Sequence, residues 1–210
     1  MTADSFGDHL VTSIESLEGL YGMPKPASLA KEIDHVSDHY RALIEAAPFM
    51  ALATSGPDGL DCTPRGDAPG FVQVQDARTL LVPDRRGNNR IDSLRNILVD
   101  PRVALLFLIP GCGETIRING RAAISTDPQL CESFAVNEKA PRTVLVVTVE
   151  RIYFQCAKAI VRSRLWDPAR HVDRASLPSV GTMLAALSGG QIGGEVYDRA
   201  APERIKAELY

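Results

Sequence analysis

The sequence has few of the features that mark disulfide-rich, membrane-spanning or nucleic-acid-binding proteins. Only four of its 210 residues are cysteines, and none forms a C-x-x-C pair, so neither a zinc ribbon nor a redox dithiol is indicated. A reducing cytoplasm is the simplest location for such a chain. No apolar run approaches the ~18 residues of a membrane span, and the polar start lacks a signal peptide's apolar core. The formal net charge of −3 argues against a general nucleic-acid binder, which needs a basic surface.

Several familiar catalytic motifs are also absent. The sequence contains no G-x-S-x-G, no P-loop and no G-x-G-x-x-G, so hydrolase, Walker-type and Rossmann functions lack support. His35 and His39 stand four residues apart, a spacing that zinc sites use on helices. No third ligand is evident nearby, so we interpret both as surface histidines and predict no metal.

The composition that remains is that of an ordinary globular protein, with 45% hydrophobic and 23% charged residues. The length fits one large domain with additions. We expect a helical segment over residues 1–48 packed on a β-barrel over residues 49–168, followed by an irregular or helical tail over residues 169–210.

The periodicity of the hydrophobic residues supports this division. Apolar residues recur every three or four positions from Leu10 to Leu17 and again from Leu29 to Leu43, which predicts amphipathic helices. From Phe49 the pattern changes to short strands separated by Gly, Pro and Asp, with helices expected near Asn88 and at Asp127. The expected strands are residues 50–54, 60–66, 71–74, 79–83, 102–109, 115–124 and 143–154.

The strand pattern favours an antiparallel barrel. The segment 102–109 is almost uniformly apolar, as expected for a strand buried on both faces. Strands joined by short turns with few intervening helices suggest an antiparallel barrel rather than a parallel sheet.

The segment Pro83–Asn96 is a candidate phosphate site. Four of its residues are arginines, and Gly87 with Asn88 or Asn89 can turn the chain into a helix. Guanidinium groups beside a helix N-terminus suit a phosphate. The alternative is an ordinary strand–turn–helix with solvated arginines.

Two further segments carry clustered charge. In Thr63–Phe71, Arg65 and Asp67 could form a structural ion pair, or Arg65 could point at a bound anion. After the last strand, Lys158 and Arg162 share one helix face, where like charges repel mildly unless an anion lies nearby. A solvated basic face is the alternative for this second segment.

Taken together, four sequence segments resemble those of the FMN-binding split-barrel superfamily, which includes pyridoxamine 5′-phosphate oxidases. They are PRGDAPGF (64–71), LLVPDRRGNNRIDSLRNIL (80–98), ETIRINGRA (114–122) and FQCAKAIVRSRLW (154–166). The last segment is most similar to a bacterial branch known only as FMN-dependent enzymes of unknown substrate. The resemblance covers roughly residues 10–168. It implies a mainly β fold with α additions, a six-stranded antiparallel split barrel with N-terminal helices, in a homodimer with FMN at the subunit interface.

The resemblance also implies site residues. Arg65 matches the arginine that reaches the FMN phosphate, and Arg90 keeps the charge of a phosphate-clamp lysine, whereas Asn88 and Asn89 depart from that clamp's pattern. Thr115 matches a position that approaches the flavin from the other subunit. The full set of expected cofactor-binding residues is Arg65, Asp67, Arg85, Asn88, Asn89, Arg90, Thr115, Arg117, Lys158, Arg162 and Ser163.

The end of the sequence departs from the true oxidases. Their C-terminal stretch rich in Arg and His, which ends in R-L-x-P, is replaced by ERIKAELY (203–210). Efficient pyridoxamine 5′-phosphate oxidation is therefore not expected. We predict an FMN-dependent oxidoreductase in which the cofactor supplies the chemistry, with substrate and electron donor unspecified. Cys156 and Ser163 are candidate catalytic groups by proximity alone. The alternatives are a non-catalytic flavin carrier or sensor, and a haem-binding split-barrel protein, although all four histidines fall outside the expected strands.

Overall fold

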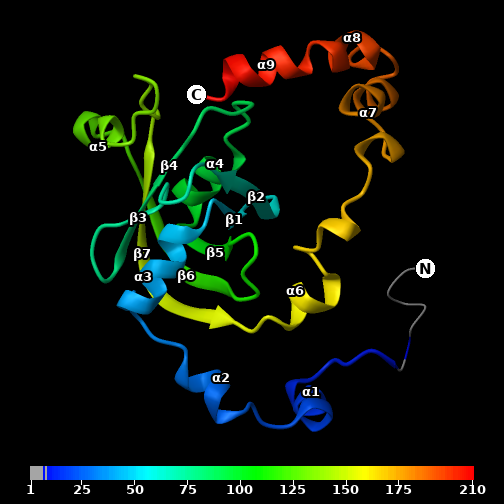
Figure 1. Ribbon diagram of the computed structural model, residues 1–210. Coiled ribbons are helices and arrows are strands. Elements are labelled where there is room, and N and C mark those ends of the chain that lie inside the picture. The colour runs from blue at the N-terminus through cyan, green and yellow to red at the C-terminus, as the bar shows by residue number, and fades with distance from the viewer. Residues whose placement is uncertain (1–6, 8) are drawn as a thin grey trace. The chain divides into compact units, whose positions relative to one another are not determined.

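An antiparallel sheet of seven strands dominates the computed structural model, which describes Gly7 and residues 9–210 (Figure 1). Its strand order is β2-β1-β5-β6-β7-β4-β3. The bounds are β1 Phe49–Gly56, β2 Gly59–Gly66, β3 Gln73–Val74, β4 Thr79–Pro83, β5 Arg102–Leu108, β6 Thr115–Ser125 and β7 Val144–Gln155. The antiparallel sheet is confirmed, with seven strands rather than six, because the two-residue β3 pairs with β4 as a separate edge strand.

Strand β5 differs from its prediction. Its residues alternate between buried and more exposed positions, with Leu105 and Phe107 buried and Leu106 38% exposed. The prediction of a strand buried on both faces is therefore wrong for this chain by itself. One face of the sheet contacts the core and the other does not, although both carry apolar side chains.

The longest pairing joins β6 and β7 and contains an irregularity beside Gly120. The register shifts between Asn119 and Gly120, and a Cβ atom on Gly120 would lie 2.1 Å from the Thr148 carbonyl oxygen. Glycine at this position therefore permits a close approach of two backbones that any side chain would prevent.

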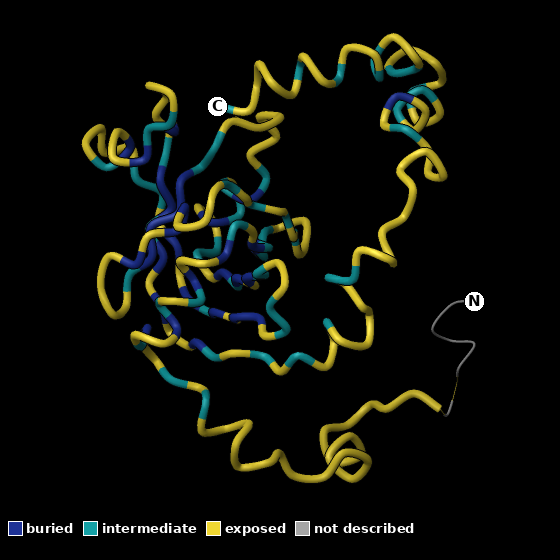
Figure 2. The backbone as a smooth tube through the Cα atoms, viewed as in Figure 1, coloured by how far each residue is buried: buried dark blue, intermediate teal, exposed yellow. Residues whose placement is uncertain are grey.

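The core lies between the inner face of the sheet and helices α3 (Asp38–Ala46) and α4 (Asp92–Val99), and it is the dark region of Figure 2. Tyr40 and Ile44 of α3 and Ile97 of α4 are buried in it. A smaller buried cluster forms where α5 (Pro128–Glu132) covers β4 and β7. The predicted start of α5 is confirmed, because Asp127 accepts hydrogen bonds from the backbone amides of Gln129 and Leu130.

The helices before the sheet are shorter than the sequence predicted. The chain divides into two units, Met1–Glu32 and Ile33–Tyr210. The first holds α1 (Ile14–Tyr21) and α2 (Pro26–Ala30), which bury none of their residues. The continuous rhythm from Leu29 to Leu43 does not form one helix, because Ile33 instead pairs with Ile152 as an isolated β-bridge.

The segment after β7 is mostly helical. It contains α6 (Lys158–Ser163), α7 (Val180–Leu187), α8 (Gly194–Arg199) and α9 (Ala201–Glu208). The expected linker Leu187–Gly194 is the turn between α7 and α8. None of the helices formed by the described residues is long and apolar enough to cross a membrane.

Candidate functional site

A cavity of about 860 Å³ lies beside the ends of β2 and β4. The segment that joins β4 to α4 forms much of its wall. Its lining residues are Asp61–Gly66, Phe71, Pro83–Leu94, Lys139–Arg142 and Tyr210. Cavities of ~300–1,000 Å³ are typical of cofactor and small-molecule sites.

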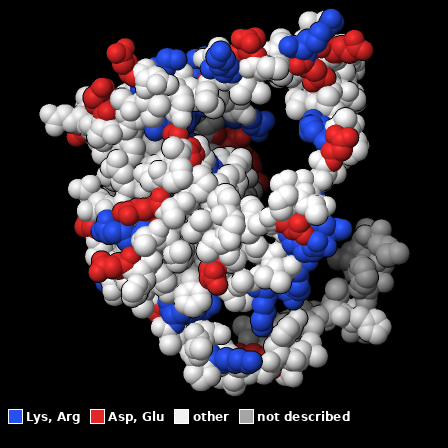
Figure 3. Space-filling model, viewed as in Figure 1, with Lys and Arg blue, Asp and Glu red and all other residues white. Residues whose placement is uncertain are grey.

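Charge distinguishes this cavity from the rest of the chain. Six of its lining residues are cationic and three are carboxylates, in a chain whose formal net charge is −3. On the face seen in Figure 3, by contrast, Lys and Arg lie interspersed with Asp and Glu. The cationic side chains are Arg65, Arg85, Arg86, Arg90, Lys139 and Arg142, and the carboxylates are Asp61, Asp84 and Asp92. The excess of positive charge favours an anionic ligand.

Arg65 points from β2 to the end of β4. The Arg65 side chain is 19% exposed and its guanidinium forms an ion pair with Asp84, so the alternative of a pair between Arg65 and Asp67 is wrong. The Nε atom of Arg65 is buried and has no hydrogen-bond partner among the described residues. A buried N–H group without a partner costs free energy, so a ligand atom that accepts this hydrogen bond would be favoured.

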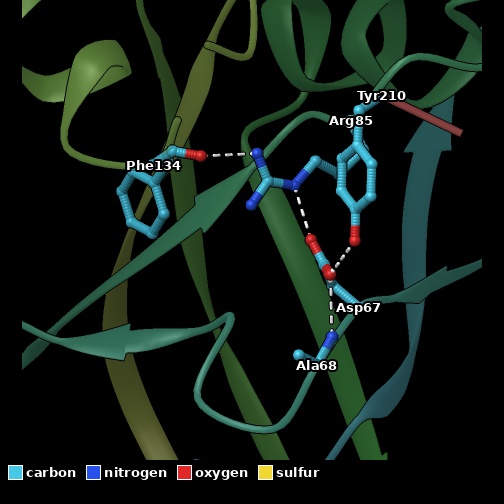
Figure 4. Close-up of polar contacts among 5 residues, drawn as sticks. All are labelled: Asp67, Ala68, Arg85, Phe134 and Tyr210. Atoms are coloured by element: carbon cyan, nitrogen blue, oxygen red, sulfur yellow. Dashed lines mark hydrogen bonds and ion pairs between the residues drawn. The ribbon is translucent and has the colours of Figure 1, made fainter. Parts of the chain in front are cut away.

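Asp67 and Arg85 form a second ion pair, which Figure 4 shows. Arg85 donates from Nε to Asp67 (2.7 Å) and from Nη1 to the Phe134 carbonyl oxygen (2.6 Å). The hydroxyl of Tyr210 donates to the other oxygen of Asp67 (2.7 Å), which also accepts from the Ala68 amide. Arg85 is therefore held by the protein rather than free to turn toward a ligand.

These contacts change the acidity of both Asp67 and Tyr210. Burial raises the pKa of the Asp67 carboxyl, but the hydrogen bonds from Tyr210, Ala68 and Arg85 outweigh burial and hold the pKa below 3.8. The hydrogen bond to Asp67, together with burial, raises the pKa of the Tyr210 phenol above 10. Asp67 is thus a carboxylate and Tyr210 a neutral phenol near pH 7.

The turn into α4 differs from its predicted form. The helix begins at Asp92, and its N-cap residue is Ile91, which has a left-handed backbone (φ 54°) and makes no side-chain cap. Asn88 instead accepts a hydrogen bond from the Arg90 amide (3.0 Å), so the prediction that Asn88 or Asn89 caps the helix is wrong. Arg90 pairs with Asp92 (2.8 Å) and remains mostly exposed.

The other expected cofactor residues do not line the cavity. Thr115 is buried at the start of β6, and Arg117 lies over the Tyr153 ring at 5.7 Å. Lys158 and Arg162 do share α6, as predicted, and the Ser163 hydroxyl donates to the Ile160 carbonyl oxygen (3.1 Å).

The cavity therefore collects five of the expected residues: Arg65, Arg85, Asn88, Asn89 and Arg90. Asp67 contacts it through Arg85 and Tyr210. The sequence analysis missed Asp84, Lys139, Arg142 and Tyr210, which are brought there from β4's end, from the loop before β7 and from beyond α9. No spacing pattern links these residues, so no signal in the sequence could have found Tyr210.

The histidines form no metal site in the part of the chain that the structure describes. His35 contacts the neighbouring Asp34 (3.0 Å). No group of three or more His, Cys, Asp or Glu residues that could hold a metal ion occurs among the described residues.

The fold and the cavity define an antiparallel-sheet protein with a cationic pocket beside the sheet. The model of the family described as pyridoxamine 5′-phosphate oxidase matches residues 36–156, which is more than half of the chain. The chain belongs to this pyridoxamine 5′-phosphate oxidase-like, FMN-binding split-barrel family. The family resemblance seen in the sequence is confirmed.

Solved structures and curated proteins add little to this assignment. The HupZ protein of Group A Streptococcus shares 17% identity at a TM-score of 0.48, over 58% of this chain and 94% of that one. General stress protein 26 of Bacillus anthracis shares 19% sequence identity at a TM-score of 0.41, over 54% of this chain and 88% of that one. A FAD-binding protein of Mesorhizobium loti shares 15% sequence identity at a TM-score of 0.41, over 57% of this chain and 94% of that one. Because these scores are below 0.5, the family assignment depends on residues 36–156 alone. No curated protein matches the chain.

Proposed function

We propose that this protein is an FMN-dependent oxidoreductase whose cavity holds the phosphate end of the cofactor. The observation that carries the proposal is the buried Nε of Arg65, a donor without a partner, at a cavity with more cations than carboxylates. A terminal phosphate dianion supplies both the acceptor and the charge that this site lacks. Family membership supports the choice of a flavin over other phosphate-bearing ligands.

The residues present fit this group. Arg65 would donate from Nε while Asp84 holds its Nη1 in place. Arg86 and Arg142 are exposed cations on the cavity wall and add charge there. Bound FMN would supply hydride or electron transfer, and the chain's own residues would hold and orient it.

A homodimer would complete the site. The outward faces of β1 and β5 form an apolar surface, which we call the outer face, of Phe49, Ala51, Ala53, Ala104, Leu106 and Leu108; these residues pair across the two strands and none is buried. Next to it, Arg117 pairs in register with Leu106. A second copy packed on this face would bring Thr115 and Arg117 toward a neighbouring subunit, which is consistent with their place in the family's pattern.

The phosphate assignment is tested by replacing Arg65. We expect Arg65→Gln to weaken FMN binding about 10- to 100-fold, because one hydrogen bond between charged groups contributes about 1.5–3 kcal/mol. Isothermal titration with FMN and with riboflavin measures the change, and the loss should be confined to FMN. The control is Arg151→Gln, which changes an exposed arginine of β7 outside the cavity. Equal FMN affinity in the Arg65 variant and the wild type would refute the assignment.

Turnover separates an enzyme from a carrier. We expect the FMN-loaded protein to oxidise NAD(P)H or to reduce an acceptor in steady state. A carrier or sensor would hold FMN without turnover, and a haem-binding protein would instead purify with a Soret absorption band.

A further inference from the structure

Tyr210 reaches the cavity from a distant part of the chain. Every other lining residue lies between Asp61 and Arg142, whereas Tyr210 stands two residues beyond the end of α9. Helix α9 itself buries none of its residues, so it has no apolar face holding it against the sheet. Its attachment at the cavity therefore depends on polar contacts at Tyr210.

Three contacts hold Tyr210 at the cavity wall. Its hydroxyl donates to Asp67 (2.7 Å), and its ring centroid lies 5.6 Å from the guanidinium carbon of Arg85. The ammonium group of Lys139 donates to its backbone oxygen (3.1 Å). The three partners come from the loop after β2, the end of β4 and the loop before β7, so one residue joins three separate segments of the chain at the cavity.

We propose that Tyr210 is a further residue of this ligand site, where it forms a releasable cover that retains a bound anionic ligand. The identity of that ligand as FMN rests on the proposed function. Two partners of Tyr210, Arg85 and Lys139, are themselves cations of the cavity wall. A phosphate accepts charge-assisted hydrogen bonds from an ammonium group, so Lys139 can exchange the Tyr210 oxygen for a ligand as the cover opens.

The cover can be tested without any flavin. Phenylglyoxal modifies accessible guanidinium groups, and the Arg85 side chain, on which the Tyr210 ring stacks, is 17% exposed. We expect Tyr210→Ala to raise the rate of Arg85 modification severalfold, as measured by peptide mass spectrometry. Arg102, which is 70% exposed and does not line the cavity, serves as the internal standard. Leu209→Ala, at the exposed neighbouring residue, is the matched control and should leave the Arg85 rate unchanged.

The second measurement uses the FMN-loaded protein. After dilution, we expect FMN to leave the Tyr210→Ala variant about tenfold faster than the wild type or Leu209→Ala, because the hydrogen bond to a charged carboxylate is lost. Tyr210→Phe keeps the ring and the backbone oxygen and should lie between the two.

The two measurements separate failure of the cover from failure of the proposed function. An unchanged rate of Arg85 modification in Tyr210→Ala overturns the cover, whether or not FMN binds. If FMN binds, an unchanged release rate overturns it as well. If the wild type binds no FMN, the proposed function fails, and faster modification of Arg85 then still supports a cover over an anion site.

Discussion

The charged residues of the cavity differ in whether their hydrogen-bond donors already have partners in the protein. Arg85 donates from Nε to Asp67 and from Nη1 to Phe134, and its guanidinium lies over the Tyr210 ring, so it shapes the wall and contributes charge without needing to contact a ligand. Arg65 is engaged at one nitrogen and unsatisfied at another. Both are half-buried arginines at strand ends, so the difference between them comes from which hydrogen-bond acceptors lie near each guanidinium.

The pKa of Asp67 is the first residue-scale prediction. Tyr210→Phe removes a donor to the carboxylate, so the pKa of Asp67 should rise from its depressed value toward the ordinary 3.8. Carbon-13 NMR of the carboxyl resonance measures it, and Tyr197→Phe, whose ring packs on Arg204, should leave it unchanged. A fall in the Asp67 pKa on removing the hydroxyl would contradict the assignment.

The same linkage sets the pH range in which the Asp67–Tyr210 contact stabilises the protein. A depressed carboxyl pKa contributes stability above the unfolded value of about 3.9 and loses it as pH falls through the folded pKa. A raised phenol pKa contributes stability below the unfolded value of about 10 and loses it as pH rises through the folded pKa. The Asp67–Tyr210 contact is therefore complete between about pH 4 and pH 10, and the destabilisation caused by Tyr210→Phe should decrease as the pH moves out of that range on either side.

At the scale of elements, the amphipathic helix α4 shows which apolar residues contact the core. The spacing of Ile91, Leu94, Ile97 and Leu98 in the sequence predicts one apolar helix face. In the structure, however, Ile97 is 3% exposed and Leu98 is 77% exposed. The helix begins only at Asp92, so Ile91 belongs to the turn. An apolar residue next to the buried stripe is not buried with it unless a neighbouring element covers it.

Adjacent substitutions in α4 test this burial. Ile97→Ala should lower the free energy of unfolding by about 2–5 kcal/mol, because it leaves a cavity in the core. Leu98→Ala should change it by less than about 0.5 kcal/mol, as is usual for surface positions. Urea denaturation measures both, and equal losses at the two positions would show that Leu98 is also buried.

At the scale of the whole molecule, the outer face of β1 and β5 is an apolar surface that nothing in a single chain buries among the described residues. Uniformly apolar sequence in β5 predicted burial on both faces, and the described chain buries only one. A second copy on the outer face would bury the other, which reconciles the sequence pattern with the structure.

We therefore expect light scattering at micromolar concentration to give a dimer of twice the monomer mass of 22.8 kDa. Leu106→Glu should shift it toward the monomer, because it places a charge in the proposed interface. Leu98→Glu, on the exposed side of α4, is the matched control and should remain dimeric. A wild-type protein of monomer mass would refute the dimer.

The second whole-molecule prediction concerns the substrate. We expect the FMN-loaded protein not to oxidise pyridoxine or pyridoxamine phosphate efficiently, because residues 167–210 do not resemble the Arg- and His-rich stretch of the true oxidases. Correct orientation of a substrate can lower the activation free energy by about 7–11 kcal/mol, and loss of the positioning residues can remove much of that effect. Pyridoxal phosphate formation with a kcat/KM of about 10⁴–10⁸ M⁻¹s⁻¹ would contradict this prediction.

Local chemistry in the sequence was sufficient for the strands, for α5 and for part of the site. Short apolar segments separated by Gly, Pro and Asp predicted the strands β1, β4, β6 and β7, and Asp127 followed by Pro128 predicted a helix start, since each is a short-range signal. The cluster of arginines before α4 likewise identified one wall of the cavity, because its members are neighbours in the chain.

What the sequence alone could not determine is which distant groups meet. Strand order decides which residues pair with Arg65 and Arg85 and which face of β5 is exposed. The path of the chain after β7 brings Tyr210 to Asp67, 143 residues away in the sequence. An ion pair or a hydrogen bond depends on distances of a few ångströms in space, and spacing along a chain that folds back on itself does not encode those distances. The sequence by itself determined the family, the antiparallel strands and an arginine-rich turn, whereas the tertiary structure alone decided which arginines are already satisfied and which residue covers the cavity.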